Sequence, residues 1–347
     1  MDGGDREGTK THPCLFFSRG RHPIKEKHLS GKPRPSERGA SRWDMKGRLF
    51  SSGIEHKKAR WGWTFIIPSL VFFSLFSFYP ILNALYTSLF SKKLLSLKPP
   101  TFIGFDNYVY LFRSPDFWNS VRATFVFTVG TFVPIVVFSL TLALFIMSRK
   151  RFQKFFQMAY YSPAVLSSVV VAAIWLLMLD PRGLANQWVN FILNTPGIDH
   201  KWLANSTTVQ ISTMMVYFWK YVGYFTIIFL VGLGSIPKSI HEAAMTDGAT
   251  GWTDFLYITL PLLKPTTVLV SIMSMLQCLK TFSTQYLFTQ GGAPMEPINV
   301  ITLNLYYTTI RDRNIGLASA MSIILFCMML FFTWLQFKTF RSEEVHY

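Results

Sequence analysis

The side chains best suited to binding a solute form polar stripes within two long apolar stretches of this sequence. At about 100° per residue, a helix over 209–233 places its polar residues within about a third of its circumference. These residues are Thr213, Tyr217, Lys220, Tyr221 and Tyr224. A similar stripe in 263–287 contains Ser271, Ser274, Gln277, Cys278, Thr281 and Gln285. Aromatic faces can pack on the C–H surfaces of a bound solute, and amides or hydroxyls can bond its polar groups.

Tyr224 with Ser274 and Gln277 would therefore suit a solute that has both C–H surfaces and hydroxyl groups, although Ser and Thr in membrane helices often bond only across helix contacts. Polar groups facing lipid are costly, so either interpretation turns these faces toward a cavity or a partner helix. The predicted substrate path consists of Tyr217, Lys220, Tyr221, Tyr224, Ser274, Gln277 and Thr281.

Lys220 is the ionisable residue that the sequence places in the middle of an apolar stretch. It could attract an anion or act as a gate, for instance for a polyol phosphate. Alternatively, its long side chain bonds carbonyls or water inside the protein. Lys280 lies off the polar stripe, near the outer end of its stretch, and its side chain is expected to extend toward the outer face of the membrane. The centres of the stretches contain no Asp or Glu, which argues against a carrier coupled to protons or sodium ions.

Six apolar stretches are long enough to position these residues in a bilayer. Only 15% of the 347 residues are charged, against about 25% in a soluble domain. A spanning helix needs about 20 apolar residues, because backbone groups in lipid have no water to bond. The stretches are 61–90, 123–147, 156–179, 209–233, 263–287 and 317–337. Pro68 and Pro80 predict a kink or an interfacial portion in the first, so the expected fold is an all-α integral membrane protein.

The net charge of +16 is partly concentrated in residues 1–60, which hold 15 Lys and Arg against seven Asp and Glu. Their Pro, Gly and Ser content predicts a disordered tail, and a native start at Met45 is one hypothesis. Basic segments beside spans favour the cytoplasm, which predicts that both termini and the 149–154 loop lie inside, although the basic residues of 92–122 oppose this. A tail that binds nucleic acid is the least favoured alternative, because it lacks interleaved aromatic and basic residues.

Catalytic and cofactor motifs are absent from the sequence. No G-x-x-x-x-G-K-[ST] loop occurs, so a nucleotide would have to be bound by another chain. Cys14, Cys278 and Cys327 have no metal-ligand spacing, and the seven His residues are scattered. We therefore expect that the chain is not an enzyme and that it binds neither a metal nor a cofactor itself.

The segment 236–265, IPKSIHEAAMTDGATGWTDFLYITLPLLKP, interrupts the apolar pattern between two stretches. It predicts two short helices, the first capped by Ser235 with Pro237 in its first turn. Gly248 suits the left-handed residue that ends a helix, and Thr250 or Thr253 can cap the second helix. Small residues at 243, 244, 248 and 249 would leave a low surface against which another backbone could pack.

This segment resembles the EAA loop of permease subunits of ATP-binding-cassette (ABC) importers. The match consists of E-A-A-x-x-D-G-A followed by FLYITLP, and it is similar in detail to the carbohydrate-uptake group typified by the maltose transporter. It extends to FLVGLGSIP, TQGGAP and IGLASAMSIILF, so it covers about residues 61–340. The glycine-pair loop and the G-x-A-S-A sequence resemble the first permease of the usual pair. Ala293 and Ser283 depart from the common pattern, so the resemblance does not define the extracellular gate or the substrate.

The resemblance implies a type I importer fold of six transmembrane helices over 61–347. It also implies that transport is coupled to ATP hydrolysis by a partner. A coupling helix would dock on an ATPase subunit through Glu242, Ala243, Ala244, Asp247, Gly248, Ala249 and Pro261. The implied partners are a second permease, forming a heterodimer, two ATPase subunits that use ATP and Mg²⁺, and an extracellular solute-binding protein. The implied solute is an oligosaccharide, a monosaccharide or a polyol or glycerol phosphate. The alternative from another class is a stand-alone secondary transporter or channel for a small polar solute.

Overall fold

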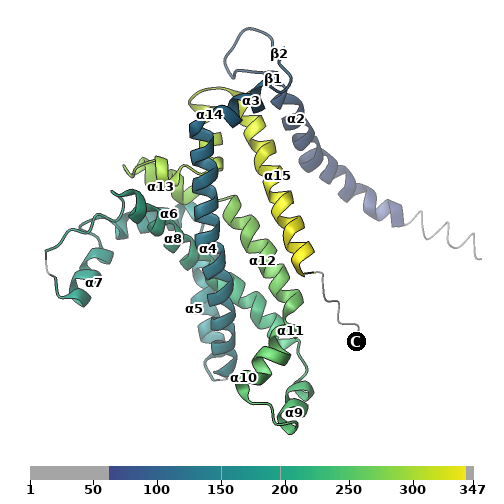
Figure 1. The fold of residues 1–347 in the computed structure, drawn as a ribbon, viewed down its shortest axis with the longest axis vertical. Helices are drawn as coiled ribbons and strands as arrows, with labels where there is room; N and C mark the ends of the chain where they lie inside the picture. The colour runs from purple at the N-terminus through teal and green to yellow at the C-terminus, as the bar shows by residue number, and fades with distance from the viewer. Residues whose placement is uncertain (1–61, 150, 196, 341–347) are drawn as a thin grey trace, which may run out of the picture. The chain divides into compact units, whose positions relative to one another are not determined.

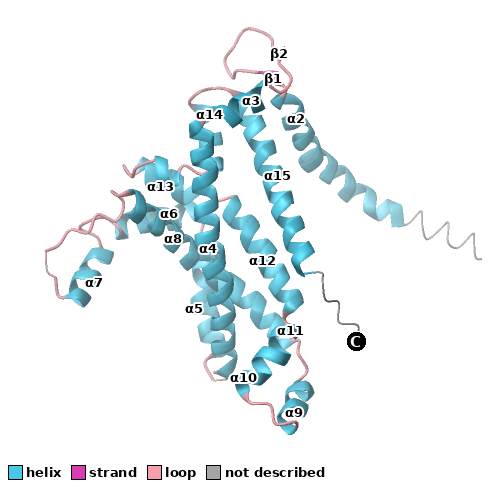
Figure 2. Ribbon diagram, viewed as in Figure 1, coloured by secondary structure: helices cyan, strands magenta, loops and turns pink. Residues whose placement is uncertain are grey.

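The computed structural model describes residues 62–149, 151–195 and 197–340, and these residues are almost entirely helical (Figures 1 and 2). The tail of residues 1–60, including Met45, lies outside the described residues, so its predicted disorder stays a prediction. The chain divides at Val71 into two units, and apart from the start of the first long helix the features discussed below belong to the second, Phe72–Tyr347.

Four described helices are long and apolar enough to cross a membrane, and two bent helix pairs bring the number to six if each pair is one span. The four are Gly62–Ser88, Pro115–Ser148 (α4), Ser206–Gly234 (α8) and Ile315–Thr339, which lies in α15 (Ile315–Phe340). The first contains a π-helical turn, Ser74–Phe78, and ends with α2, Tyr79–Ser88. The predicted irregularity therefore occurs just before Pro80 and not at Pro68.

Short helices and strands form the connections between these long helices. The first connection contains β1 (Phe90–Ser91) paired antiparallel with β2 (Thr101–Phe102), then α3 (Asp106–Arg113). Between α4 and α8 lie α5 (Gln153–Val165), α6 (Ser168–Met178) and α7 (Leu184–Leu193). Between α8 and α15 follow α9 (Lys238–Thr246), α10 (Gly251–Asp254), a π turn (Phe255–Thr259), α11 (Leu260–Leu262), α12 (Lys264–Leu279), α13 (Ser283–Gln290), a 3-10 turn (Glu296–Ile298) and α14 (Ile301–Ile310).

The main hydrophobic core lies between α4, α8 and α12, and small groups let the backbones approach closely there. The hydroxyl of Ser139 in α4 donates a hydrogen bond to the carbonyl of Val222 in α8 at 2.9 Å. Gly223 faces α5 so closely that a Cβ atom would overlap the backbone carbonyl of Tyr160. Such small-residue contacts are typical of packed membrane helices, where lipid gives no hydrophobic drive toward association.

The predicted third span, 156–179, is not one helix, because α5 and α6 meet at a bend of 97°. Pro163 lacks the N–H that would bond the Ala159 carbonyl, and the Ser162 hydroxyl donates to that carbonyl instead at 3.0 Å. Leu166 is extended, and the Ser167 side chain then caps α6 by accepting a hydrogen bond from the Val170 N–H at 3.2 Å.

The predicted fifth span, 263–287, also differs, since α12 ends at Leu279 and α13 begins only at Ser283. Helical bonding stops here, so backbone carbonyls are freed at membrane depth and need other donors. The hydroxyl of Tyr217 in α8 donates to the Gln277 carbonyl at 2.7 Å, and the hydroxyl of Thr302 in α14 donates to the Thr281 carbonyl. The break is therefore stabilised by side chains from distant helices.

Candidate functional site

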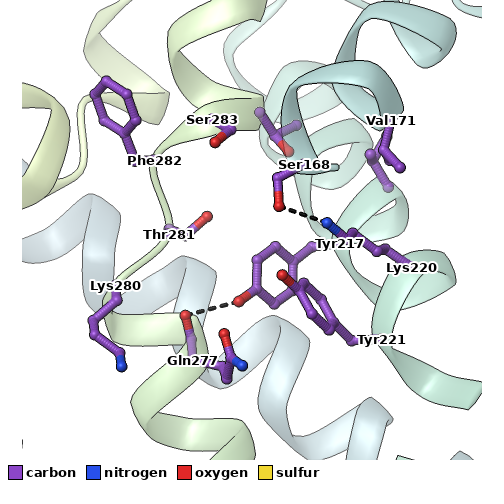
Figure 3. A pocket seen from close by; sticks show the side chains of 12 residues that line it. Ser168, Val171, Tyr217, Lys220, Tyr221, Gln277, Lys280, Thr281, Phe282 and Ser283 are labelled. Atoms are coloured by element: carbon purple, nitrogen blue, oxygen red, sulfur yellow. Dashed lines mark hydrogen bonds between the residues drawn. The ribbon is translucent and has the colours of Figure 1, made fainter. Parts of the chain in front are cut away.

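A polar cavity of about 230 Å³ lies between α6, α8 and the break after α12 (Figure 3). Its polar lining residues are Ser168, Tyr217, Lys220, Tyr221, Gln277, Lys280, Thr281, Ser283 and Thr284, and its apolar ones are Val171, Val216 and Phe282. Both unexpected helix breaks border this cavity, because Ser168 begins α6 and residues 280–282 separate α12 from α13.

Lys220 supplies a positive charge to this cavity although only 5% of the residue is exposed. Its Nζ atom donates to the hydroxyl of Ser168 at 2.5 Å and lies 5.0 Å from the centre of the Tyr221 ring. No Asp or Glu is among the residues that line the cavity. The nearby groups that stabilise the ammonium are therefore a hydroxyl and an aromatic face.

Tyr217 holds the wall of the cavity in place. Besides donating to the Gln277 carbonyl, its ring packs edge-on against Phe127 at 5.3 Å and lies 4.5 Å from the Tyr221 ring. These contacts join α4, α8 and α12 at one point. A change in the position of α12 relative to α8 must therefore alter the cavity.

The structure brings together five of the seven residues predicted for the substrate path: Tyr217, Lys220, Tyr221, Gln277 and Thr281. Ser274 is fully buried, and its hydroxyl donates to the Val270 carbonyl of its own helix at 2.7 Å. Tyr224 packs against the main core and the ring of Phe225. The suggested grouping of Tyr224 and Ser274 with Gln277 therefore does not occur within this cavity.

Sequence reasoning missed Ser168, Lys280, Ser283 and Thr284 as lining residues. Lys280 was expected to extend toward the outer surface, whereas it borders the cavity because α12 ends just before it. A signal for Ser168 was available, since Ser167 and Ser168 follow Pro163 closely and serine is a preferred helix cap. No comparable local signal marks the end of α12.

The segment between α8 and α12 contains a helix whose end is fixed by local hydrogen bonds. Gly248 has a φ of +85°, and the Ala249 N–H donates to the Ala244 carbonyl at 2.9 Å while the Gly248 N–H donates to Met245 at 3.1 Å. This is the Schellman arrangement predicted by the glycine. Thr250, one of the two threonines predicted as caps, is the N-cap residue of α10, and it forms a capping box with Thr253.

The beginning of α9 differs from the prediction. Ser235 does not cap α9, because its hydroxyl donates to the Gly232 carbonyl at 2.6 Å. Pro237 is itself the N-cap residue, with extended backbone angles, and α9 begins at Lys238. The short α9 is therefore separated from α8 by an extended proline and is free of a side-chain cap.

A contact that the sequence did not predict joins α9 to α10. His241 Nδ1 lies 2.9 and 3.0 Å from the two carboxylate oxygens of Asp254, and the Thr259 hydroxyl donates to the same carboxylate at 3.2 Å. Both side chains of the pair are largely buried, at 30% and 21% exposed. The pair fixes α9 against the helices that lead into α12.

The residues expected to dock on a partner lie on one small helix and its end. Glu242, Ala243, Asp247 and Gly248 are exposed, Ala249 is half-buried and Pro261 is exposed at the turn toward α12. Ala244 is only 7% exposed. It is covered by its own chain, so it is not part of the open surface that its small size had suggested.

The sequence matches the family model described as "Binding-protein-dependent transport system inner membrane component" over residues 135–339, which is more than half of the chain. It is 29% identical to the lactose transport system permease protein LacF of Rhizobium radiobacter, covering 82% of this chain and 95% of that one. It is 30% identical to the sulfoquinovosyl glycerol transport system permease protein SmoG of Agrobacterium fabrum, covering 80% and 90%.

The fold is also that of a solved transporter subunit. A bacterial ABC transporter described as importing the acidic polysaccharide alginate superposes with a TM-score of 0.68 at 22% identity, covering 85% of this chain and 98% of that one. The related permeases favour a transport subunit over a stand-alone carrier or channel and over an enzyme. The chain belongs to the family of inner membrane components of binding-protein-dependent transport systems, as a multi-pass permease of the ABC importer type.

Proposed function

We propose that this chain forms half of the translocation path of an importer that carries a carbohydrate or carbohydrate-like solute across the bacterial cell membrane. The observation that carries this proposal is the similarity, over four fifths of the chain, to permeases named for lactose and for sulfoquinovosyl glycerol. The cavity between α6, α8 and α12 agrees with it, because it offers hydroxyl, amide and aromatic groups to a polyhydroxylated solute.

The chain acts with partners that supply energy and select the solute. A second permease completes the path as a heterodimer in which this chain is the first of the pair, and two ATPase subunits bind ATP and Mg²⁺. An extracellular solute-binding protein delivers the solute; the alginate transporter has been solved with its alginate-bound periplasmic protein. The chain itself contributes no catalytic group and binds neither a cofactor nor nucleic acid.

The coupling surface consists of Glu242, Ala243, Asp247, Gly248, Ala249 and Pro261, with Ala244 supporting it from beneath. Small residues allow a close fit into a groove, and a carboxylate can accept charge-assisted hydrogen bonds from the partner. The rigid α12 begins at Lys264, beside this segment, and ends at Leu279, beside the cavity. Its 16 residues span about 24 Å, so one helix can carry a displacement from the ATPase to the solute.

We further propose that both termini lie in the cytoplasm. In Figure 1 α4 ends at the same end of the second unit where α9 and α10 lie, and Arg149 and Arg151 follow α4 in the sequence. Basic loops stay inside, which supports a cytoplasmic position for that end. A protease applied to intact cells should leave a tag at the C-terminus intact, whereas its removal would contradict this orientation.

The test of function is uptake by cells that lack this chain and by the same cells with the chain restored. Labelled oligosaccharides, monosaccharides and glycerol phosphates are offered singly, and uptake is compared before and after depletion of ATP. We expect one class of saccharide to enter only when both the chain and ATP are present. Uptake of the same solute by vesicles that contain this chain alone would contradict the proposal.

A further inference from the structure

We propose that the solute carried by this chain is an anionic saccharide, bearing a carboxylate, phosphate or sulfonate, and that Lys220 binds its anionic group in the cavity. This inference rests on the proposed function, because it assumes that the cavity between α6, α8 and α12 is part of the translocation path. It goes further by naming the charge of the solute and the side chain that recognises it.

The charge of Lys220 is not paired with an acidic residue in the cavity lining. A lysine in the middle of a membrane helix is costly unless it is paired or faces a polar cavity. Here only 5% of the residue is exposed, and its neighbours include the Ser168 hydroxyl and the Tyr221 ring. None of the lining residues carries a carboxylate. An anion entering the cavity would therefore meet a charge that no acidic lining residue neutralises.

Lys220 offers more hydrogen-bond donors than the Ser168 hydroxyl accepts. An ammonium group has three N–H donors, and the Ser168 hydroxyl accepts from one of them at 2.5 Å. Charge-assisted hydrogen bonds to carboxylate or phosphate oxygens are about twice as strong as neutral ones. Figure 3 shows Lys220 reaching toward Ser168 from α8 at the cavity wall, so an oxyanion can approach beside this hydroxyl.

A second cation, Lys280, borders the same cavity. Lys280 lies across the cavity from Lys220 in Figure 3, with its amino group directed away from it. Lys280 is exposed, so its charge is screened by water more than that of Lys220. It raises the positive potential at the border without forming the binding contact. The two lysines give the cavity a net positive lining.

The remaining lining residues fit the saccharide part of such a solute. Gln277 and Ser283 are half-buried and can bond sugar hydroxyls, and the Tyr221 ring offers an aromatic face. The volume of about 230 Å³ is below the ~300–1,000 Å³ of pockets for drug-sized ligands. The cavity in this chain therefore suits one sugar unit with its anionic group, and the second permease supplies the opposite wall.

The test compares matched solutes in cells that express the complete importer. Each pair consists of an anionic saccharide and its neutral counterpart, such as a galacturonate and a galactose oligosaccharide, or a sugar phosphate and the same sugar without its phosphate. Wild-type importer should take up the anionic member of at least one pair and discriminate against the neutral one. Uptake of neutral members with exclusion of all anionic ones would overturn the inference while leaving saccharide import intact. Import of neither kind would remove the proposed function as well.

Three variants then test the role of Lys220. Lys220→Gln should lower uptake of the anion at least about tenfold, as expected for loss of a charge-assisted contact, whereas Lys220→Arg should retain most of it. Lys280→Gln is the matched control, since it removes an exposed cation from the same cavity, and its loss should stay below about threefold. Wild-type uptake of the anion by Lys220→Gln would overturn the assignment. If this variant fails to assemble, the wild-type preference for anionic members still decides the charge of the solute.

Discussion

The coupling segment, residues 236–265, and the cavity at the far end of α12 are both built from broken helices, yet different interactions stabilise them. The segment is held by contacts between residues close in sequence: the Schellman end at Gly248, the capping box at Thr250 and the pair of His241 with Asp254. The cavity is held by contacts between distant residues, such as Tyr217 with Gln277 and Lys220 with Ser168.

Because of this difference, the coupling segment can move as a unit, whereas the cavity changes when that segment moves. Because its hydrogen bonds are internal, the coupling segment can keep its shape while a partner displaces it. The cavity cannot, since a shift of α12 against α8 changes the distance between Tyr217 and the Gln277 carbonyl. Displacement at one end of α12 is thereby converted into a change of the lining at the other. Four substitutions test this contrast, and they follow in order of decreasing effect.

Gly223→Leu should prevent assembly, because its side chain would overlap the backbone of Tyr160 where α5 packs on α8. Overpacking at a well-packed position costs about 1–3 kcal/mol or more, and a backbone neighbour cannot move aside easily. The measurement is the amount of protein in the membrane and its thermal stability in detergent. Gly234→Leu is the control, since α8 leaves open space within 4 Å of that glycine. Equal stability of the two variants would contradict the described packing.

Gly248→Pro should leave the protein in the membrane but abolish uptake. Proline fixes φ near −65° and lacks an N–H, so it fits neither the φ of +85° nor the bond from the Gly248 N–H to Met245. Gly248→Asn should retain part of the uptake, because asparagine tolerates the left-handed conformation. Gly251→Ala is the matched control within α10, where nothing lies within 4 Å. Normal uptake by the proline variant would show that the shape of this segment does not matter.

Tyr217→Phe should lower thermal stability by an amount equivalent to about 1–3 kcal/mol, because the Gln277 carbonyl loses its donor in a buried site. The ring contacts with Phe127 and Tyr221 are kept, so the effect isolates the hydroxyl. Uptake should fall with stability, since the same bond positions the end of α12. A variant as stable as wild type would mean that water or another donor replaces the hydroxyl.

His241→Ala should have the smallest effect, a several-fold loss of uptake with normal amounts of assembled protein. Hydrogen bonds to charged groups contribute about 1.5–3 kcal/mol, and partial exposure of this pair places it at the lower end. Asp254→Ala should act alike, and the double variant should lose little more, as expected for two members of one contact. Additive losses would show that the residues act independently.

The contrast between the two regions also explains what the sequence could predict. The helix end at Gly248 and a capping threonine at the start of α10 were predicted correctly, because the deciding hydrogen bonds join residues three to five apart. The end of α12 was not, because it depends on hydroxyls of Tyr217 and Thr302 that come from other helices. Periodicity placed Ser274 on the polar stripe, but that face is covered by packing and its hydroxyl bonds its own helix.

The bend between α5 and α6 lies between these cases. Pro163 and the two serines after it are local signals, but a bend of 97° was needed to turn Ser168 toward Lys220. Hydropathy treats 156–179 as one span, since it records composition and not direction. Lys280 borders the cavity because α12 stops just before it, and its exposure leaves the predicted extension toward the outer surface a prediction.

The most direct test of the central claim is photo-crosslinking from α9 in the assembled importer. A photoreactive residue replaces Ala243, and the control carries it at Val137 in α4, which is 55% exposed on a membrane helix. The account predicts a crosslink from position 243 to an ATPase subunit, with a yield that changes when ATP is added, and no such product from position 137. Crosslinks from position 243 to lipid or to this chain alone would contradict it.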